Sequence, residues 1–540
     1  MLVCVMPAAT LDQLVSLCKR RGFVFPGSEI YGGLANTWDY GPLGTELKQR
    51  IKQLWWKRFV HQRRDMVGLD ASILMNPRTW EASGHVGNFS DLMSSCKFCK
   101  KLVRADHWDD LVSASPWFRS LQELYARQKE VTLEDLGHWG QKEGKKLSPN
   151  LALVRNPSVT LSWLSEYLEK ASKVAEEGTL IQTSIRELVK YMATEQLETT
   201  GLVMPCPYCG GVLTKPKPFN LLFKTQQGII EGEGQDIYLR PETAQGIFVN
   251  FKNVAQTTRR RLPFGIAQIG KAFRNEITPG NFTFRTREFE QMEIEYFFDP
   301  EQSKWEDIFA MWKKDSWSFL VDTLGISAEN LRFRDHEKDE LSHYSKGTTD
   351  IEYKFPWGWG ELCAAAAYRG NYDLTQHQEF SGEDLSYTDP DDPTRKIIPH
   401  VMEPSFGADR VTLAVLLDAY TDEELPGGDI RTMLKLRPQV APFDLAILPL
   451  SKKEKLISKA ESLYKKIIQE TDLVVDFDVT GSIGKRYRRQ DEIGTPECIT
   501  IDFGTVGEDS AQGEADTITI RNRDTLVQER VTIAEFLKRL

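Results

Sequence analysis

One stretch of the chain, Phe264 to Phe298, carries charged and aromatic side chains at spacings that could do chemistry. In its second half one parity holds Ile294, Tyr296 and Phe298, and the other holds Arg285, Arg287, Phe289, Gln291, Glu293 and Glu295. In an extended strand these sets face opposite sides, so one face packs and the other presents guanidinium groups, a ring and carboxylates. Guanidinium groups suit phosphate, a ring suits a nucleobase, and a carboxylate suits an ammonium group. The alternative is a buried antiparallel hairpin with a polar edge.

Two extended segments joined by a turn must hold these groups in place. We expect the first strand from Phe264 to Phe273 and the second from Arg287 to Phe298, because Ile277 to Asn281 are rich in turn formers. A later arginine, Arg410, precedes an apolar helical pattern from Val411 to Tyr420. Since anions are favoured at a helix N-terminus, Arg410 should meet a phosphate there rather than join a surface ion pair.

Four of the cysteines form two CxxC pairs, Cys96 with Cys99 and Cys206 with Cys209. This spacing lets two thiolates bind one tetrahedral zinc ion, so the two pairs can close one four-cysteine site if the chain between them loops out. Such a site is structural, because it has no open position for catalysis. The alternative is four reduced cysteines without a metal.

Composition places the chain among ordinary globular proteins. Its 540 residues correspond to about two to four domains, with 41% hydrophobic and 27% charged residues. The net charge of -10 argues against binding nucleic acid over the whole surface but allows a local basic patch. No apolar run approaches the roughly 20 residues of a membrane span, and the N-terminus lacks the basic start of a signal peptide. We therefore expect a cytoplasmic protein that does not enter a membrane.

Several motifs resemble those of the class II aminoacyl-tRNA synthetases. Arg274-x-Glu276, a loop and Arg285-x-Arg287-Glu288-Phe289 are similar to motif 2 of that class, and Glu403 to Arg410 is similar to motif 3. Within the class, the chain resembles the homodimeric glycyl-tRNA synthetases. That likeness rests on three blocks, RPETAQGIF (Arg240 to Phe248), GKAFRNEITP (Gly270 to Pro279) and REFEQMEIEYF (Arg287 to Phe297).

The resemblance implies a ligase that joins glycine to tRNA(Gly). The glycine carboxylate would attack the α-phosphate of ATP, with Mg²⁺ bridging the phosphates through Glu361, and the terminal ribose hydroxyl of the tRNA would then attack the glycyl-adenylate. Arg274 would stabilise the α-phosphate, Arg285 and Arg410 would hold the β- and γ-phosphates, and Phe289 would stack on adenine. Glu276 would hold the adenine amino group or the tRNA end.

The resemblance also implies sets of site residues. The catalytic residues are Arg274, Glu276 and Arg410. The ATP-binding residues are Arg274, Asn275, Glu276, Phe284, Arg285, Thr286, Arg287, Glu288, Phe289, Glu361, Leu362, Gly407, Ala408, Asp409 and Arg410. The glycine-binding residues are Arg104, Glu242, Phe289, Glu290, Gln291, Met292, Glu293, Arg369, Glu403, Pro404, Ser405, Phe406 and Gly407. The glutamate that matches Glu242 binds the ammonium group in the family, whereas Ala364 to Ala367 stand where the family usually has Gly-Ile-Ala.

The implied fold is α+β, with a class II antiparallel sheet flanked by helices, a helical insertion and a C-terminal α/β anticodon-binding domain. We expect domains at 1–104 with motif 1, 105–200 as the insertion, 201–436 with motifs 2 and 3, and 437–540. A helix from about Thr45 to Val60 either makes the dimer interface, as in the family, or packs within its own subunit. The insertion either holds the tRNA acceptor stem or supports the core; within it we expect a loop from Gly137 to Pro149 and a helix from Thr160 to Ala171.

Beyond Pro438, strands alternate with helices, which predicts a small α/β domain. It contains a basic run that resembles the anticodon-binding signature, formed by Lys485, Arg486, Tyr487, Arg488 and Arg489. Charge for phosphate and a ring for stacking suit single-stranded RNA, whereas the alternative is a solvated helix face. Near the start of the chain, His85 is either a catalytic base or a hydrogen-bonded structural residue, the commoner role of a lone loop histidine.

Two other functions compete with glycine ligation. The first is another class IIa synthetase, specific for threonine, proline or histidine, against which the RPETAQGIF and EFEQME blocks argue. The second is a synthetase-like paralogue that binds nucleic acid without catalysis. Such a protein should have lost Arg274, Glu276 or Arg410, and all of these residues are present.

Overall fold

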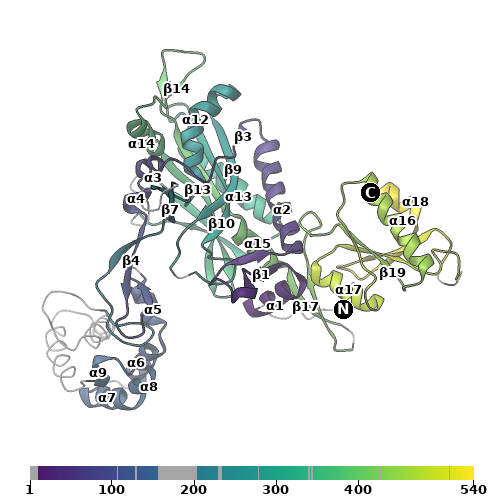
Figure 1. Cartoon of the computed structure of the whole chain (residues 1–540), viewed down its shortest axis with the longest axis horizontal. Helices are drawn as coiled ribbons and strands as arrows, with labels where there is room; N and C mark the ends of the chain where they lie inside the picture. Colours follow the sequence, from purple (N-terminus) through teal and green to yellow (C-terminus); the bar gives the residue numbers. More distant parts are fainter. Residues whose placement is uncertain are drawn as a thin grey trace. The chain divides into compact units, whose positions relative to one another are not determined.

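A seven-stranded sheet forms the centre of the larger of two compact units (Figure 1). The computed structural model describes residues 10–105, 107–127, 131–155, 204–228, 234–277, 279–338, 341, 345–425, 427–509, 511 and 513–540. The larger unit comprises Met1–His85 and Leu222–Leu540, and the smaller comprises Val86–Leu221. The central strands are, in spatial order, β11 (Leu331–Asp335), β12 (Thr348–Phe355), β13 (Gly358–Gly370), β16 (His400–Gly407), β10 (Glu288–Phe298), β9 (Phe264–Phe273) and β3 (Met66–Gly68). All neighbours are antiparallel except β9 and β3, as expected for an α+β fold.

Helices cover both faces of this sheet. The even-numbered residues of β10 from Met292 onward belong to the main hydrophobic core, together with residues of α2 (Pro42–Trp56), α13 (Trp305–Ser318) and α15 (Ala408–Ala419). On the other face, α12 (Ala244–Thr258) and α14 (Tyr372–Ser381) cover the far end of β10. There the rings of Phe251 and Phe297 lie 4.4 Å apart between centroids, and truncating such a buried ring costs about 3–5 kcal/mol. Residues 288–296 of β10 therefore lead directly into a region of the sheet that helices cover.

The predicted strands and helices are largely confirmed. The first strand has the predicted bounds, Phe264–Phe273, but β10 begins at Glu288, so Arg285 and Arg287 belong to the loop before it. That loop turns through Asn281 and Phe282, which have φ values of 56° and 60°. The predicted helix before Val60 begins earlier, at Pro42, and continues as a π-helical turn, η2 (Lys57–His61). Its buried residues Leu47, Ile51 and Trp55 pack inside their own subunit.

The smaller unit is built on a three-stranded sheet, in the order β5 (Leu102–Arg104), β4 (Ser90–Ser95) and β6 (Lys217–Asn220). Its helices are α5 (Trp108–Ser113), α6 (Pro116–Arg127), α7 (Leu133–Trp139), the π-helical turn η3 (Gly140–Gly144), α8 (Lys145–Leu147) and α9 (Ala152–Arg155). The loop predicted from Gly137 to Pro149 is therefore wrong. Gly140 and Gly144 lie in the π-helical turn, where Gly140 packs against Leu153 and Gly144 against Trp139. The predicted helix from Thr160 to Ala171 lies outside the described residues.

The C-terminal region forms a separate five-stranded sheet with helices, in line with the predicted small α/β domain. Its strands are, in spatial order, β20 (Val475–Phe477), β19 (Leu445–Pro449), β21 (Glu497–Ile501), β22 (Thr517–Asn522) and β23 (Gln528–Thr532). The helices are α16 (Glu454–Glu470), α17 (Ile483–Ile493) and α18 (Ile533–Arg539), and the last begins with a capping box between Thr532 and Glu535. A buried apolar cluster joins this sheet to α16 and α18.

Short elements complete the described chain. They are α1 (Leu11–Arg21), β1 (Val24–Pro26), η1 (Glu29–Tyr31), β2 (Trp38–Tyr40), α3 (Arg78–Ala82), α4 (His85–Asn88), β7 (Lys224–Gln227), β8 (Gln235–Tyr238), η4 (Phe319–Thr323), η5 (Ala328–Asn330), β14 (Tyr387–Thr388), β15 (Lys396–Ile397), β17 (Tyr420–Glu424) and β18 (Ile430–Leu434). Among the helices that the structure describes, none is both long and apolar enough to cross a membrane.

Candidate active site

A cavity of about 220 Å³ opens on the central sheet, between β10, β13, β16, the loop before β10 and the N-terminus of α15. Most of the expected ATP and glycine side chains of these elements line it. The lining residues are Glu242, Arg274, Glu276, Thr283, Phe284, Arg285, Thr286, Phe289, Gln291, Glu293, Glu361, Ala364, Glu403, Ser405, Gly407, Asp409 and Arg410. The cavity thus joins guanidinium groups and rings to a set of carboxylates.

At one end the cavity is basic and aromatic. The guanidinium of Arg274 lies 5.3 Å from the ring centroid of Phe289 and donates to the carbonyl of Pro241 at 3.0 Å. Arg410 lies in the first turn of α15, where its guanidinium is 4.6 Å from the ring centroid of Phe284 and 3.1 Å from the carboxylate of Glu361. The positive charge of Arg410 lowers the pKa of Glu361. This end can hold a polyphosphate beside a flat ring system.

The loop before β10 is tied down by its own backbone and by Arg287. Arg285 and Gly280 exchange backbone hydrogen bonds at 3.0 and 3.2 Å. The guanidinium of Arg287 donates to the carbonyls of Glu276 and Ala35, both at 3.1 Å. Arg287 therefore holds the loop and the N-terminal segment in place, whereas Arg285 lines the cavity.

At the other end the cavity is acidic. Glu242 stands just before α12, where Gln245 donates to its carboxylate at 2.9 Å and the Nε2 of His85 lies 3.4 Å from it. The Nδ1 of His85 lies 2.8 Å from the Ser83 hydroxyl, so the ring is held from both sides. Burial alone would raise the pKa of Glu242, but the charges of His85 and Arg369 lower it overall. Glu242 is therefore an anion that suits an ammonium group.

Glu293 and Glu403 face the same end from adjacent strands. Glu293 pairs in register with Ser405, whose hydroxyl donates to its carboxyl at 2.9 Å, and the Thr243 hydroxyl donates to the other oxygen. Burial and the charges of Glu403 and Glu242 raise the pKa of Glu293 to about 8. Arg369 donates to Glu403 at 2.5 Å and forms a bidentate pair with Asp373, at 2.8 and 2.9 Å. Arg369 thus contacts the carboxylates of Glu403 and Asp373 but does not itself line the cavity.

Some expected site residues take other positions. In the described part of the chain, the cavity lining does not include Asn275, Arg287, Glu288, Leu362, Ala408, Glu290, Met292, Arg369, Pro404 and Phe406. Met292 and Phe406, which were predicted to bind glycine, turn their side chains into the core by strand alternation, where both are fully buried, so their side chains do not line the cavity. Glu290 lies on that face too and pairs with Lys48 at 3.0 Å and Lys52 at 2.8 Å.

Two residues that line the cavity, Thr283 and Ala364, were not among the predicted site residues. Ala364 pairs in register with Ser405, so a correct strand pairing would have found it, whereas nothing in the sequence singles out Thr283. His85 was expected to be either a base or structural, and it contacts Glu242. Arg104 lies on β5 of the smaller unit, 3.3 Å from Asp91.

The basic run of the C-terminal region is split between the interior and the surface. Arg486 is buried and donates to the carbonyls of Pro449, Asp478 and Leu450. Tyr487 bonds to Thr500 through its hydroxyl, and the Arg521 guanidinium lies 4.7 Å from its ring centroid. Contrary to expectation, Arg486 is therefore not placed to meet RNA, whereas Tyr487 is partly exposed. The remaining members line an open cavity of about 530 Å³, formed by Arg21, Ser482, Gly484, Lys485, Arg488 and Arg489.

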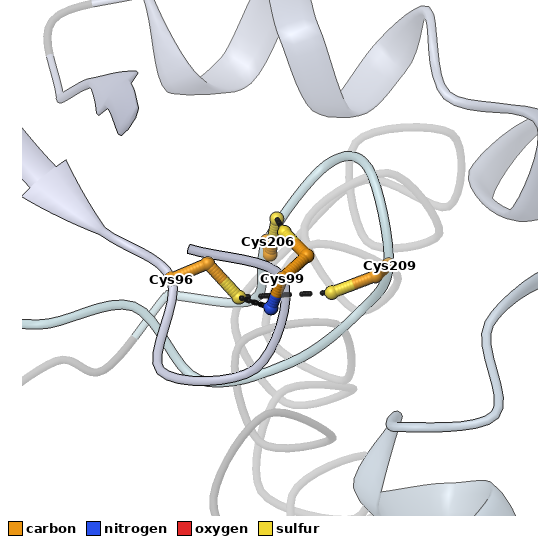
Figure 2. Close-up of side chains that lie close together, drawn as sticks. All are labelled: Cys96, Cys99, Cys206 and Cys209. Carbon is orange, nitrogen blue, oxygen red and sulfur yellow. Dashed lines mark hydrogen bonds between the residues drawn. The ribbon is translucent and has the colours of Figure 1, made fainter. Parts of the chain in front are cut away.

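The four cysteines of the CxxC pairs converge in the smaller unit (Figure 2). Their sulfur atoms all lie within 4.8 Å of one another, with 3.6 Å between Cys96 and Cys209 and 3.7 Å between Cys99 and Cys206. A tetrahedral zinc ion with Zn–S distances of about 2.3 Å requires sulfur atoms about 3.8 Å apart. The spacing therefore fits a four-thiolate zinc site.

Comparison with known proteins adds two family matches and a set of near relatives. Residues 223–421 match the family described as tRNA synthetase class II core domain (G, H, P, S and T), and residues 444–540 match the family described as anticodon binding domain. The chain is 50% identical to the glycine–tRNA ligase of Clostridium kluyveri, over 97% of this chain and 96% of the relative. It is equally identical to those of Clostridium acetobutylicum, over 98% of both chains, and Geobacillus thermodenitrificans, over 98% and 96%.

Proposed function

We propose that this chain, which belongs to the glycine–tRNA ligase family of class II synthetases, activates glycine with ATP and transfers it to tRNA(Gly). The observation that carries the proposal is the two-ended cavity. Arginines and a ring lie at one end, and Glu242, Glu293 and Glu403 lie at the other, within one lining. An amino acid whose ammonium group meets the carboxylates would point its own carboxylate toward the arginine end, where ATP is expected to bind.

In the first step the glycine carboxylate attacks the α-phosphate of ATP and displaces pyrophosphate. A carboxylate is already a nucleophile, so the site needs no general base, and most of the rate enhancement comes from positioning. Arg274 stabilises the charge that develops on the α-phosphate, and Arg285 and Arg410 hold the outer phosphates. Phe289 stacks on adenine, and Glu276 holds its amino group or the tRNA end.

Mg²⁺ bound with ATP would neutralise part of the phosphate charge. Glu361 is the side chain that would hold it, because its half-exposed carboxylate lines the cavity and keeps a negative charge beside Arg410. Selection for glycine follows from the carboxylates that read the ammonium group and from a space too small for a larger side chain.

The C-terminal domain binds the tRNA to which glycine is transferred. Lys485, which is exposed, and Arg488 and Arg489, which are partly exposed, meet phosphates there, whereas the buried Arg486 maintains the fold. The negative net charge of the chain favours binding through this small basic surface over general nucleic-acid binding.

We also propose a homodimer, supported by the strongly exposed apolar side chains Ile30 and Tyr31, at 87% and 85%. A cytoplasmic location remains a prediction.

The domain division 1–104, 105–200, 201–436 and 437–540 remains our proposal. The family matches fall inside the third and fourth segments. The smaller compact unit, Val86–Leu221, contains the proposed insertion and extends beyond it at both ends, so that it includes both CxxC pairs.

The four cysteines bind a structural zinc ion in this proposal, which the sulfur spacing supports. Metal analysis of the purified protein should find about one zinc per chain, and Cys99→Ser should lower that content. Cys363→Ser, which alters a cysteine buried in the core of the larger unit, is the control and should keep the zinc. Zinc-free wild-type protein purified without chelators would contradict the site.

The function is tested by charging purified tRNA with labelled glycine. Glycine alone should be attached, and threonine or proline should neither be attached nor compete. Attachment of another amino acid would favour the alternative of a different class IIa synthetase. No attachment of any amino acid, with tRNA still bound, would favour the non-catalytic paralogue.

A further inference from the structure

The acidic end of the cavity holds more carboxyl groups than cations. Arg369 serves both Glu403 and Asp373, at hydrogen-bond distances of 2.5 to 2.9 Å. Glu242 has His85 beside it at 3.4 Å. Like charges this close in a buried site cannot all be kept ionised, because each raises the cost of ionising the next. At least one carboxyl group must therefore be neutral while the site is empty of a cation.

Glu293 is the carboxyl group of the cavity whose contacts are with neutral groups. Its oxygens accept from the hydroxyls of Thr243 and Ser405 and, at 3.3 Å, from the amide of Gln291. Only 2% of Glu293 is exposed. The charged groups that act on Glu293 are Glu242, Glu403, Glu295 and Arg240. In the surrounding elements, His85 contacts Glu242, Arg369 contacts Glu403 and Asp373, and His377 contacts Gln245. The guanidinium of Arg240 donates hydrogen bonds to the carbonyls of Lys271 and Ala71, at 2.6 and 2.7 Å.

We propose that Glu293 carries a proton in the free enzyme and releases it to solvent when the glycine ammonium group enters the cavity. This inference rests on the proposed function. The O–H bond of the carboxylic acid breaks, the carboxylate that remains receives hydrogen bonds from the ammonium group, and water in the open cavity takes the proton. The raised pKa of Glu293, about 8, supports the protonated state near neutral pH.

Glu295 provides an internal comparison, two residues further along β10. It is fully buried, and neither of its carboxyl oxygens has a hydrogen-bond partner among the described residues. Burial raises its pKa as well. However, in the described part of the chain the cavity lining does not include it, so the ammonium group does not reach it. Glu295 therefore stays protonated throughout, and only Glu293 links protons to glycine.

The consequence is that glycine competes with a proton. Below the pKa of Glu293, each unit of falling pH should weaken glycine binding about tenfold, because one proton must leave for each glycine that binds. Above that pKa the affinity should become independent of pH until the amine of glycine itself titrates.

Calorimetry of the full-length protein tests this directly. Glycine is titrated at pH 7 into enzyme saturated with α,β-methylene-ATP, which cannot be cleaved at the α-phosphate, in buffers of different ionisation enthalpy. The expected result is release of about one proton per glycine bound. Glu295→Gln, the matched control, should release the same number, whereas Glu293→Gln should release none.

Infrared difference spectroscopy gives a second reading if Glu293→Gln binds glycine too weakly for calorimetry. The wild-type enzyme should lose a protonated-carboxyl band and gain a carboxylate band when glycine is added, and free Glu293→Gln should lack that protonated band. Glycine binding without proton release would overturn the inference and leave the proposed function intact. Proton release that disappears in Glu295→Gln but persists in Glu293→Gln would also overturn it. No glycine binding by the wild-type protein would overturn both.

Discussion

Two arginine-rich segments of this chain, both expected to meet phosphate, are built in different ways. Around the cavity, Arg274, Arg285 and Arg410 come from a strand end, a loop and a helix start, and all of them line one space. In α17, by contrast, Arg486 is 2% exposed and donates to carbonyl groups of its own domain. Successive residues of a helix point around its axis, so a continuous basic run cannot present every member to one partner. Charge alone therefore does not identify a binding residue, and the backbone that carries it decides.

The largest effect should come from removing a cavity arginine. Arg274→Ala should lower the rate of glycine-dependent pyrophosphate exchange by about 10²–10³, because it removes a donor to the charge that develops on the α-phosphate. The free energy of unfolding in urea should fall by about 1–3 kcal/mol, since the variant loses a hydrogen bond from a charged donor to Pro241 and a cation–π contact with Phe289. Arg261→Ala, at an exposed arginine paired with Asp391, is the control and should leave both quantities unchanged. A loss of activity matched by loss of folded protein would remove the distinction between the two segments.

The opposite pattern should follow from removing the buried arginine of α17. Arg486→Ala should lower the free energy of unfolding by about 1–3 kcal/mol, because the carbonyls of Pro449, Asp478 and Leu450 lose their donors. Glycine-dependent exchange by the protein that remains folded should be unchanged. Denaturation and exchange measured on the same preparation check both points. Unchanged stability, with weaker tRNA binding, would place Arg486 at the RNA surface after all.

The raised pKa of Glu293 should make the stability of the protein depend on pH. The pKa of Glu293 is raised from 4.5 to about 8 in the folded protein, so the folded state binds its proton more tightly than the unfolded state. The stability that this proton contributes is fully present below pH 4.5 and is lost as the pH rises through 8. Wild-type protein should therefore lose up to about 1.4 kcal/mol per pH unit in that window relative to Glu293→Gln. Parallel pH profiles of the two proteins would contradict the raised pKa.

The smallest effect should come from the exposed members of the basic run. Lys485→Ala should weaken tRNA binding modestly and reduce the slope of log affinity against log salt by about 1, as expected for one lost phosphate contact. Its stability should change by less than about 0.5 kcal/mol, in contrast to Arg486→Ala. Binding measured at several salt concentrations decides the matter, and an unchanged slope would show that Lys485 faces only solvent.

Sequence patterns predicted where strands lie and which residues share a face better than they predicted how deeply each side chain is buried. The strand Phe264–Phe273 and the inward parity of Gln291 and Glu293 follow from alternation alone, and both are present. Alternation could not show that Glu295, on the same face, is buried without hydrogen-bond partners, because that depends on distant parts of the chain that pack over β10. It also does not apply to Arg287, which precedes the strand and binds carbonyls instead.

The burial of residues in a basic helix was equally hard to predict from the sequence, whereas the metal-site geometry was not. The four-cysteine cluster was predictable because CxxC spacing constrains sulfur positions locally, whereas the burial of Arg486 depends on carbonyl groups from other elements of its domain. Long-range packing of this kind leaves no signal in a single sequence.

The central claim is that the cavity activates glycine, and ATP–pyrophosphate exchange without tRNA tests it most directly. Purified protein is assayed with each amino acid in turn, beside Arg274→Ala. The account predicts exchange with glycine alone and its near loss in the variant. Exchange with a different amino acid, or glycine-dependent exchange that is undiminished in Arg274→Ala, would contradict it.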